Sequence, residues 1–270
     1  MKVNTYTLDG KNDGSIELPI VFDTPIKYEV IHKAFVNINS HKFQKQGRHP
    51  TAGQDVVADS NDPPTGRGIS RVARMKGGGG GRQGQAGEVA STRGGRQAFP
   101  PNVKKTIYKK LNKKENKLAL CSAIASTASK EIVREHGHKV DNLKELPIII
   151  SDEIENVTKT SEMIKIITAL NLIDDVKRLE KRKPRTGKPV LRGRKSKIGK
   201  SVLFVLSDST KTENACSGIP GVDARSVNDL SVLDLAPGSK PARLTVYSKK
   251  AIDMISKIKS RHLELMVTIK

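Results

Sequence analysis

The chain has 270 residues and carries 49 Lys and Arg against 28 Asp and Glu, which gives a net charge of +21 and a sequence pI near 10.0. This excess is larger than solubility requires and indicates a polyanionic partner. Nucleic acid is favoured over a membrane surface because the cations accompany Gly and Pro rather than one face of an apolar helix, and no apolar run could span a bilayer. Aromatic residues make up 3% of the chain and Trp is absent, so recognition of phosphates and shape is expected over base stacking.

The amino-terminal segment predicts a small hairpin followed by a helix. Residues 2–8 alternate apolar and polar side chains, and Asp9-Gly10 and Asp13-Gly14 supply turn residues before a second short strand. Asp23-Thr24-Pro25 has the form of a helix start, and apolar residues then recur at helical spacing up to Ile38.

Residues 45–102 lack hydrophobic periodicity and contain a run of glycines at 77–81. Glycine loses more conformational freedom on ordering than any other residue, so contacts from outside the segment must order it. Guanidinium groups match phosphate oxygens, which predicts an extended internal loop that reaches into a structured RNA; a flexible linker is the alternative. The cations expected to bind RNA here are Arg67, Arg71, Arg74, Lys76, Arg82, Arg93 and Arg96.

Beyond Pro100-Pro101 the pattern alternates between helices and strands. Asn112 with Glu115 three residues later resembles a capping box, and Gly137 is expected to end that helix. Further helices are predicted at 160–170, 173–179, 227–235 and 251–258, with buried strands at 146–150, 201–206 and 243–247 and a strand entering at 219–223. The alternation predicts a single α/β domain over 1–270, with a mainly parallel central sheet flanked by helices.

Residues 181–200 form a second basic loop without any acidic residue. A single basic run is often only a solvated face, but two runs punctuated by Gly and Pro make RNA binding the favoured interpretation. The side chains expected to bind RNA in this loop include Arg185, Arg192, Arg194, Lys195 and Lys197.

Two glycine-containing segments resemble cofactor-binding motifs, but their surroundings do not fit those motifs. Gly79-x-Gly81-x-x-Gly84 matches the dinucleotide-binding letters, but no strand precedes it. Residues 193–201 miss the spacing of a phosphate-binding loop by one residue and precede a strand rather than follow one. No cofactor is therefore predicted.

Catalytic and metal chemistry is equally weak in the sequence. Cys121 and Cys216 lie far apart without zinc-binding spacing, which predicts reduced structural thiols and no metal site. Four histidines are expected at the surface or on phosphates rather than in catalysis: His41, His49, His136 and His138. Because these residues form no catalytic set, the protein is not expected to be an enzyme. The first residues lack the apolar core of a secretory signal, so an intracellular protein is expected.

Several longer segments carry a resemblance to a known family. They are QGRHP at 46–50, RVAR at 71–74, STRGGRQAFPP at 91–101, NKKENKLALCSAIA at 112–125, RGR at 192–194, IPGV at 219–222, LAPG at 235–238 and RLTV at 243–246. In these segments, and over nearly its whole length, the chain resembles the archaeal and eukaryotic branch of large-subunit ribosomal protein four, the universal L-four family.

The resemblance implies a globular α/β domain on large-subunit ribosomal RNA, in the cytoplasm, with the loop 45–102 reaching the wall of the nascent-peptide exit tunnel. There the loop would meet the universal L-twenty-two family protein and the nascent peptide, with the tip at 77–84 shaping the tunnel wall. The resemblance adds Arg48 to the expected RNA contacts. The chain ends at Lys270, without the long extension expected of eukaryotic members, which favours an archaeal source. A regulatory RNA-binding protein or a nucleic-acid-processing enzyme is the alternative.

Overall fold

The computed structural model describes residues 1–270 apart from 57, 61–64, 77–80, 259 and 270. The chain divides into two compact units. Unit 1 comprises Met1–Asn39 together with Lys110–Lys270, and unit 2 comprises Ser40–Lys109. The internal loop proposed from the sequence at 45–102 lies within unit 2.

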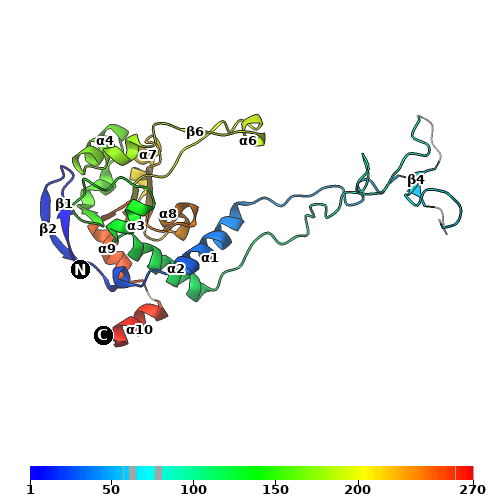
Figure 1. The fold of residues 1–270 in the computed structure, drawn as a ribbon. Coiled ribbons are helices and arrows are strands. Elements are labelled where there is room, and N and C mark those ends of the chain that lie inside the picture. The colour runs from blue at the N-terminus through cyan, green and yellow to red at the C-terminus, as the bar shows by residue number, and fades with distance from the viewer. Residues whose placement is uncertain (57, 61–64, 77–80, 259, 270) are drawn as a thin grey trace. The chain divides into compact units, whose positions relative to one another are not determined.

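A mixed sheet of six strands, counted over the described residues, forms the centre of unit 1 (Figure 1). Its spatial order is β2 (Asn12–Glu17), β1 (Lys2–Tyr6), β5 (Ile148–Ile150), β10 (Thr245–Ser248), β8 (Leu203–Leu206) and β9 (Asp223–Ser226). The edge pair β1 and β2 is antiparallel, whereas every other neighbouring pair is parallel. The prediction of a mainly parallel α/β sheet is confirmed.

Helices cover both faces of this sheet, as expected for parallel strands that are buried on two sides. One face is covered by α3 (Lys130–Glu135), α4 (Thr160–Ala169), α5 (Ile173–Lys177) and α7 (Thr210–Ser217). The other face is covered by α1 (Tyr28–Asn39), α2 (Lys113–Ser126), α8 (Val232–Leu235) and α9 (Lys249–Ser256). The helix α10 (Arg261–Ile269) follows, and short 3-10 turns lie at Ile20–Asp23, Asp152–Asn156 and Pro237–Ser239.

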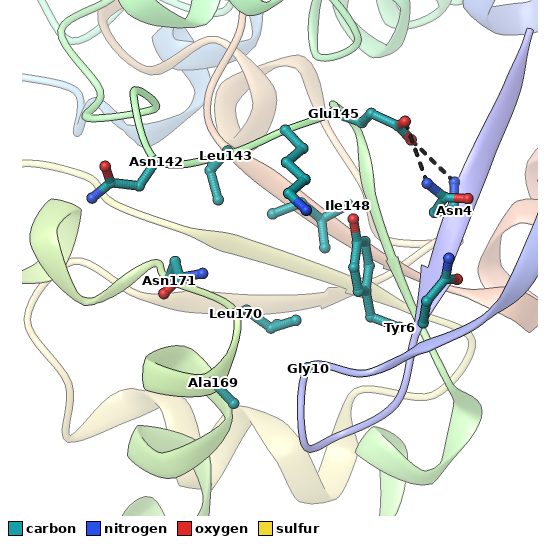
Figure 2. A pocket seen from close by; sticks show the side chains of 12 residues that line it. Asn4, Tyr6, Gly10, Asn142, Leu143, Glu145, Ile148, Ala169, Leu170 and Asn171 are labelled. Atoms are coloured by element: carbon teal, nitrogen blue, oxygen red, sulfur yellow. Dashed lines mark hydrogen bonds between the residues drawn. The ribbon is translucent and has the colours of Figure 1, made fainter.

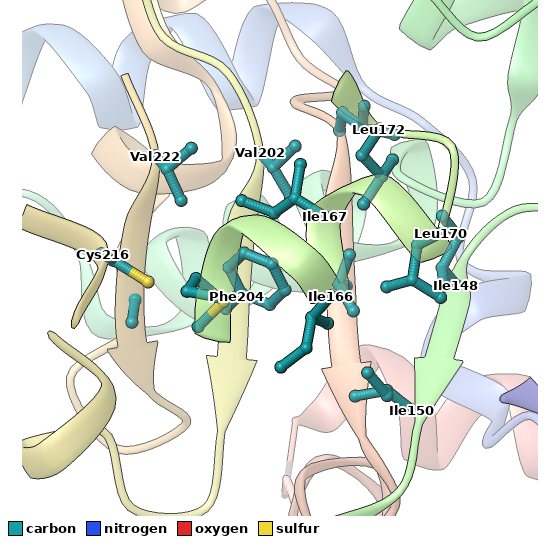
Figure 3. Close-up of a cluster of buried hydrophobic side chains, with 14 of the residues drawn as sticks. Ile148, Ile150, Ile166, Ile167, Leu170, Leu172, Val202, Phe204, Cys216 and Val222 are labelled. Atoms are coloured by element: carbon teal, nitrogen blue, oxygen red, sulfur yellow. The ribbon is translucent and has the colours of Figure 1, made fainter. Parts of the chain in front are cut away.

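Two hydrophobic clusters result, one on each face of the sheet. Side chains alternate between the faces along each strand: Ile148 and Ile150 belong to one cluster, whereas Ile149 between them belongs to the other. Figure 3 shows the first cluster, in which Ile166 and Ile167 of α4 lie over Phe204 of β8. These strands therefore read in the sequence as continuous apolar runs, because both of their faces are buried.

The amino-terminal predictions are confirmed in outline and corrected in detail. The hairpin forms, but Asp13-Gly14 lies within β2 rather than in the turn, and Gly14 pairs with Thr5. The helix forms as α1 but begins at Tyr28, because Asp23 belongs to the preceding 3-10 turn.

The helix expected from Asn112 to Gly137 is two helices, since the chain breaks after Ser126 and restarts as α3. The capping box proposed there is wrong: Asn112 sits at the N-cap position but makes no side-chain capping bond. Glu115 accepts instead from Lys33 Nζ at 2.9 Å. A true capping box occurs at α8, between Ser231 and Asp234.

The small residues of α2 allow close packing against α1 and the sheet. Ala119, Ala123 and Ile124 are completely buried, and Ser122 Oγ donates to Pro25 O at 2.9 Å. On the neighbouring strand, the ring of Tyr247 meets that of Phe22 edge to face, with ring centres 5.6 Å apart. Tight packing of this kind gives unit 1 a well-defined core, from which the basic loop at 181–200 extends.

Unit 2 contains little regular structure in its described residues. The 3-10 turn Ser40–Lys42 is followed by β3 (Ala58–Asp59), which pairs in antiparallel fashion with β4 (Arg74–Met75). Near its ends, the rings of His41 and Tyr108 meet edge to face, and Lys109 N donates to Ser40 Oγ at 3.0 Å. The unit relies on turns and local contacts, because its composition provides few apolar side chains to bury.

Candidate nucleic-acid interface

The second basic loop of unit 1 is an ordered hairpin. Its strands β6 (Lys183–Pro184) and β7 (Ser196–Lys197) are antiparallel, and Arg185 N donates to Lys195 O at 2.9 Å. A single helical turn, α6 (Lys188–Leu191), lies at the far end of this arm (Figure 1). Pro189 in the first turn of α6 and Gly187 before it, at φ 72°, fit the requirements of that sharp reversal.

The predicted cations of this hairpin face solvent, except that Arg185 is partly buried. Within the described part of the chain, none of these cations forms a salt bridge with a carboxylate. Arg192, Arg194, Lys195 and Lys197 therefore present uncompensated positive charge along one arm, which suits a phosphate backbone.

A buried ionic network holds the base of the hairpin. Asp175 on α5 is fully buried and accepts from Ser201 Oγ at 2.6 Å, while His138 Nδ1 lies 3.0 Å from its Oδ2. Arg178 Nε donates to the other carboxylate oxygen of Asp175 at 3.0 Å. The same guanidinium donates through Nη2 to Lys200 O at 3.0 Å. Residues before and after the hairpin are thus tied to one carboxylate.

A second buried charge extends this network to the sheet. Arg243 is 1% exposed and donates to Ser201 O at 2.6 Å, Gly221 O at 2.8 Å and Asp223 Oδ2 at 2.6 Å. Lys200 Nζ donates to the same oxygen of Asp223 at 2.7 Å. Lys200, which the sequence grouped with the RNA-facing run, is therefore engaged within the protein.

The two carboxylates stay ionised because of this surrounding. Burial opposes ionisation of Asp175, but hydrogen bonds and charge from His138, with Arg178 and Ser201, outweigh it and hold the pKa of Asp175 well below its usual range. Burial likewise opposes ionisation of Asp223, yet the charges of Arg243 and Lys200 lower its pKa. A buried charge is tolerated only when it is paired and hydrogen-bonded in this manner.

Sequence reasoning missed this network and misplaced His138. That side chain is 4% exposed and bonded to Asp175, so its predicted place at the surface is wrong. One signal was available: Arg243 is the first residue of the buried strand predicted at 243–247, and a charge at such a position requires a partner. The partners come from three separate segments, so no local spacing in the sequence could have identified them.

In unit 2 the predicted cations are also exposed: Arg48, Arg67, Arg71, Arg74, Lys76, Arg82, Arg93 and Arg96. Among the described residues of unit 2, three of these cations have internal partners. Lys76 Nζ lies 2.6 Å from Asp59 Oδ2, Arg74 Nη1 donates to Gly84 O at 2.8 Å, and Arg48 donates to Gln97 Oε1. The glycine run at 77–81 lies outside the described residues except for Gly81, so the predicted tip is only partly described.

In unit 2, the segment that contains Gly53 and Ala58 approaches the segment that contains Gly87 and Gly95 closely enough for backbone contact. A Cβ atom added to Gly53 would overlap the backbone of Gly95, and one added to Gly87 would lie 2.9 Å from the Cβ of Ala58. Gly53 also has a positive φ of 83°, which disfavours any other residue. These glycines therefore serve contacts within the protein.

The cysteines of the chain are buried and lie outside the two basic segments. Cys121 and Cys216 are buried free thiols, and burial raises their pKa values to about 11 and about 12. Among the described residues there is no group of three or more His, Cys, Asp or Glu side chains arranged to hold a metal. Over the same residues, no helix has both the length and the apolar character to cross a membrane.

One cavity of about 320 Å³ lies beside β1 (Figure 2). Amide side chains of Asn4, Asn142 and Asn171 line it together with the ring of Tyr6, and Glu145 accepts two bonds of 3.3 Å from Asn4. Burial and the nearby Glu145 charge raise the pKa of Tyr6. None of the predicted RNA-binding residues lines this cavity, so it is separate from the candidate interface.

The chain is similar to known proteins over most of its length. Residues 16–258 match the model of the Ribosomal protein L4/L1 family. The chain is 40% identical to the large ribosomal subunit protein uL4 of Sulfurisphaera tokodaii, over 95% of this chain and 94% of that protein. It is 39% identical to the protein of the same name from Methanosphaera stadtmanae, over 94% of this chain and 96% of that protein.

These matches bear on the predictions made from the sequence. The relatives are archaeal ribosomal proteins, which confirms the resemblance and agrees with the archaeal type. Their names denote ribosomal proteins and not enzymes, in agreement with the prediction that the chain is not an enzyme. A ribosomal protein is also consistent with the predicted cytoplasmic location. The family match extends over far more than half of the residues, and the chain belongs to the Ribosomal protein L4/L1 family.

Proposed function

We propose that this protein is a structural constituent of the large ribosomal subunit and binds large-subunit ribosomal RNA through two basic elements. The observation that carries the proposal is the 181–200 hairpin: its exposed Arg192, Arg194, Lys195 and Lys197 have no carboxylate partner in the described residues, and its base is fixed by Asp175 and Arg243. A rigidly based arm with free cations loses little conformational entropy when it binds phosphates. Such contacts position a protein on RNA without reading its sequence.

The internal loop 45–102 is proposed to reach farther into the RNA. Its composition provides no core of its own, and its exposed arginines can bind phosphates bidentately. By the family resemblance, the loop lines the nascent-peptide exit tunnel, close to the universal L-twenty-two family protein and the nascent peptide. Arg48, Arg93 and Arg96 would hold its base, and the segment around Gly81 and Gly84 would shape the tunnel wall.

An enzyme acting on nucleic acid is disfavoured by the arrangement of the buried Asp175 and the partly buried Asp223. Asp175 is hydrogen-bonded to His138 and Arg178, and Asp223 forms an ion pair with Arg243. These carboxylates are therefore committed to holding the hairpin rather than available as an acid and base.

Co-sedimentation tests the proposal directly. Tagged protein should migrate in a sucrose gradient with purified large subunits, at one copy per subunit, and should resist a moderate salt wash. Migration only at the top of the gradient, in cells where the tagged protein is the sole copy, would overturn the proposed function.

A further inference from the structure

Phe99 is an isolated and fully exposed aromatic side chain in unit 2. Its exposed fraction is 100%, which is unusual for a large apolar ring that contributes nothing to a core in this state. Its backbone has a φ of 49°, in the left-handed region that bulky side chains avoid. Pro100 follows, and a residue before proline normally adopts an extended conformation. Both the full exposure of the ring and the left-handed backbone are energetically unfavourable, and no contact of Phe99 with the described residues offsets them.

Residues just before Phe99 are held in place. Arg48 donates to the side chain of Gln97, and the backbone of Gly95 lies so close to Gly53 that no Cβ would fit there. Thr92 Oγ1 donates to Val89 O at 2.8 Å, which closes the preceding turn. A ring presented to solvent from a fixed segment is the arrangement expected of a preorganised binding residue.

The charge around Phe99 identifies the chemistry of its partner. No Asp or Glu occurs between Val89 and Lys114, whereas the cations of that stretch are Arg93, Arg96, Lys104, Lys105, Lys109, Lys110, Lys113 and Lys114. An apolar patch on another protein would account for the ring but not for the cations on both sides of it. An unpaired nucleotide accounts for both, because its base offers a π-face and its phosphates offer negative charge.

We propose that Phe99 is a base-stacking residue that receives an unpaired nucleobase of the large-subunit RNA, while cations that flank it in the sequence bind the adjoining phosphates. The inference rests on the proposed function and deepens it, since it names a contact to a base in a protein whose low aromatic content predicted phosphate contacts alone.

Fluorescence can detect the stacking directly, because the chain contains no Trp. Phe99→Trp creates a single Trp at the proposed site, and Tyr28→Trp creates a single Trp at a control position that is 52% exposed in unit 1. Addition of large-subunit RNA should quench the Trp at position 99 strongly and leave the Trp at position 28 nearly unchanged. An unquenched Trp at position 99 under conditions where the RNA is bound would refute the stacking.

Affinity provides the second readout. Phe99→Ala should weaken binding of large-subunit RNA by about 5- to 150-fold, the effect expected for one base stacked on an aromatic ring. The slope of log affinity against log salt should stay unchanged, because no charge is removed. Phe99→Tyr should bind like the wild type. Equal affinity of wild type and Phe99→Ala would overturn the inference while leaving the proposed function intact, whereas a wild type that does not bind the RNA would overturn the proposed function itself.

Discussion

The two basic segments of this protein resemble each other in sequence but are held by different physical means. The 181–200 hairpin stands on a buried ionic network in which Asp175 and Arg243 connect residues from several elements. Unit 2 instead depends on close backbone approach at Gly53 and Gly95 and on a few exposed bonds. Composition therefore indicates the partner of a segment but not how the protein supports it.

The largest effect is expected from breaking the network under the hairpin. Asp175→Asn removes a fully buried charge and leaves His138 and Arg178 without their shared partner, so it should cost about 3–5 kcal/mol in the free energy of unfolding. Urea denaturation of purified protein measures this change. Asp174→Asn on the same helix is the control, because its carboxylate accepts from Asn142 in an exposed bond and should have a small effect. Equal effects of the two substitutions would show that the buried network does not hold the hairpin.

Acid should destabilise unit 1 through the same residues. The pKa values of Asp175 and Asp223 are lowered on folding, so the stability that these carboxylates contribute is fully present above their unfolded pKa near about 4 and is lost as the pH falls through the lower folded pKa. The midpoint of thermal unfolding should fall steeply below about pH 4 in wild type. In Asp175→Asn the fall should be shallower. The same acid dependence in both proteins would contradict this assignment.

The hairpin's cations should set part of the salt dependence of RNA binding. Arg192→Ala with Arg194→Ala removes two expected phosphate contacts, so the slope of log affinity against log salt should decrease by about 1.4. Filter binding over a range of salt concentrations measures the slope. The double substitution Lys165→Ala with Lys211→Ala removes equal charge from exposed positions outside the hairpin and should change the slope less. An unchanged slope after loss of both arginines would remove the hairpin from the interface.

The smallest effect on global stability is expected in unit 2. Gly53→Ala should disturb the contact with Gly95 yet change the free energy of unfolding of unit 1 by less than about 0.5 kcal/mol, because both glycines lie in unit 2. Gly94→Ala is matched to it, since Gly94 also has a positive φ but nothing lies near its added Cβ. Trypsin should cleave at Arg96 faster in Gly53→Ala than in Gly94→Ala. Equal cleavage rates would show that the close approach of Gly53 to Gly95 does not hold these two segments of unit 2 together.

Local signals in the sequence identified the elements of the sheet but not the contacts between distant segments. Ile148–Ile150 and Leu203–Leu206 are apolar throughout because the sheet is covered on both faces, and this made them recognisable as strands. Asn112 was recognised as a helix start, but its bonding was not, because Glu115 is drawn to Lys33 on a different helix. The network around Asp175 could not be predicted from the sequence for the same reason, because ion pairs between distant segments leave no periodic pattern in the chain.

Hydrogen exchange of the full-length protein, with and without large-subunit RNA, tests the central claim most directly: unit 1 is stable by itself and the segment 65–72 of the internal loop is ordered by RNA. Without RNA, amides of β5, β8 and β10 should be strongly protected, and those at 65–72 should exchange rapidly. With RNA, residues 65–72 should become protected while the sheet stays as it was. Equal and strong protection of 65–72 in the free protein, or no change there on binding RNA, would contradict the account.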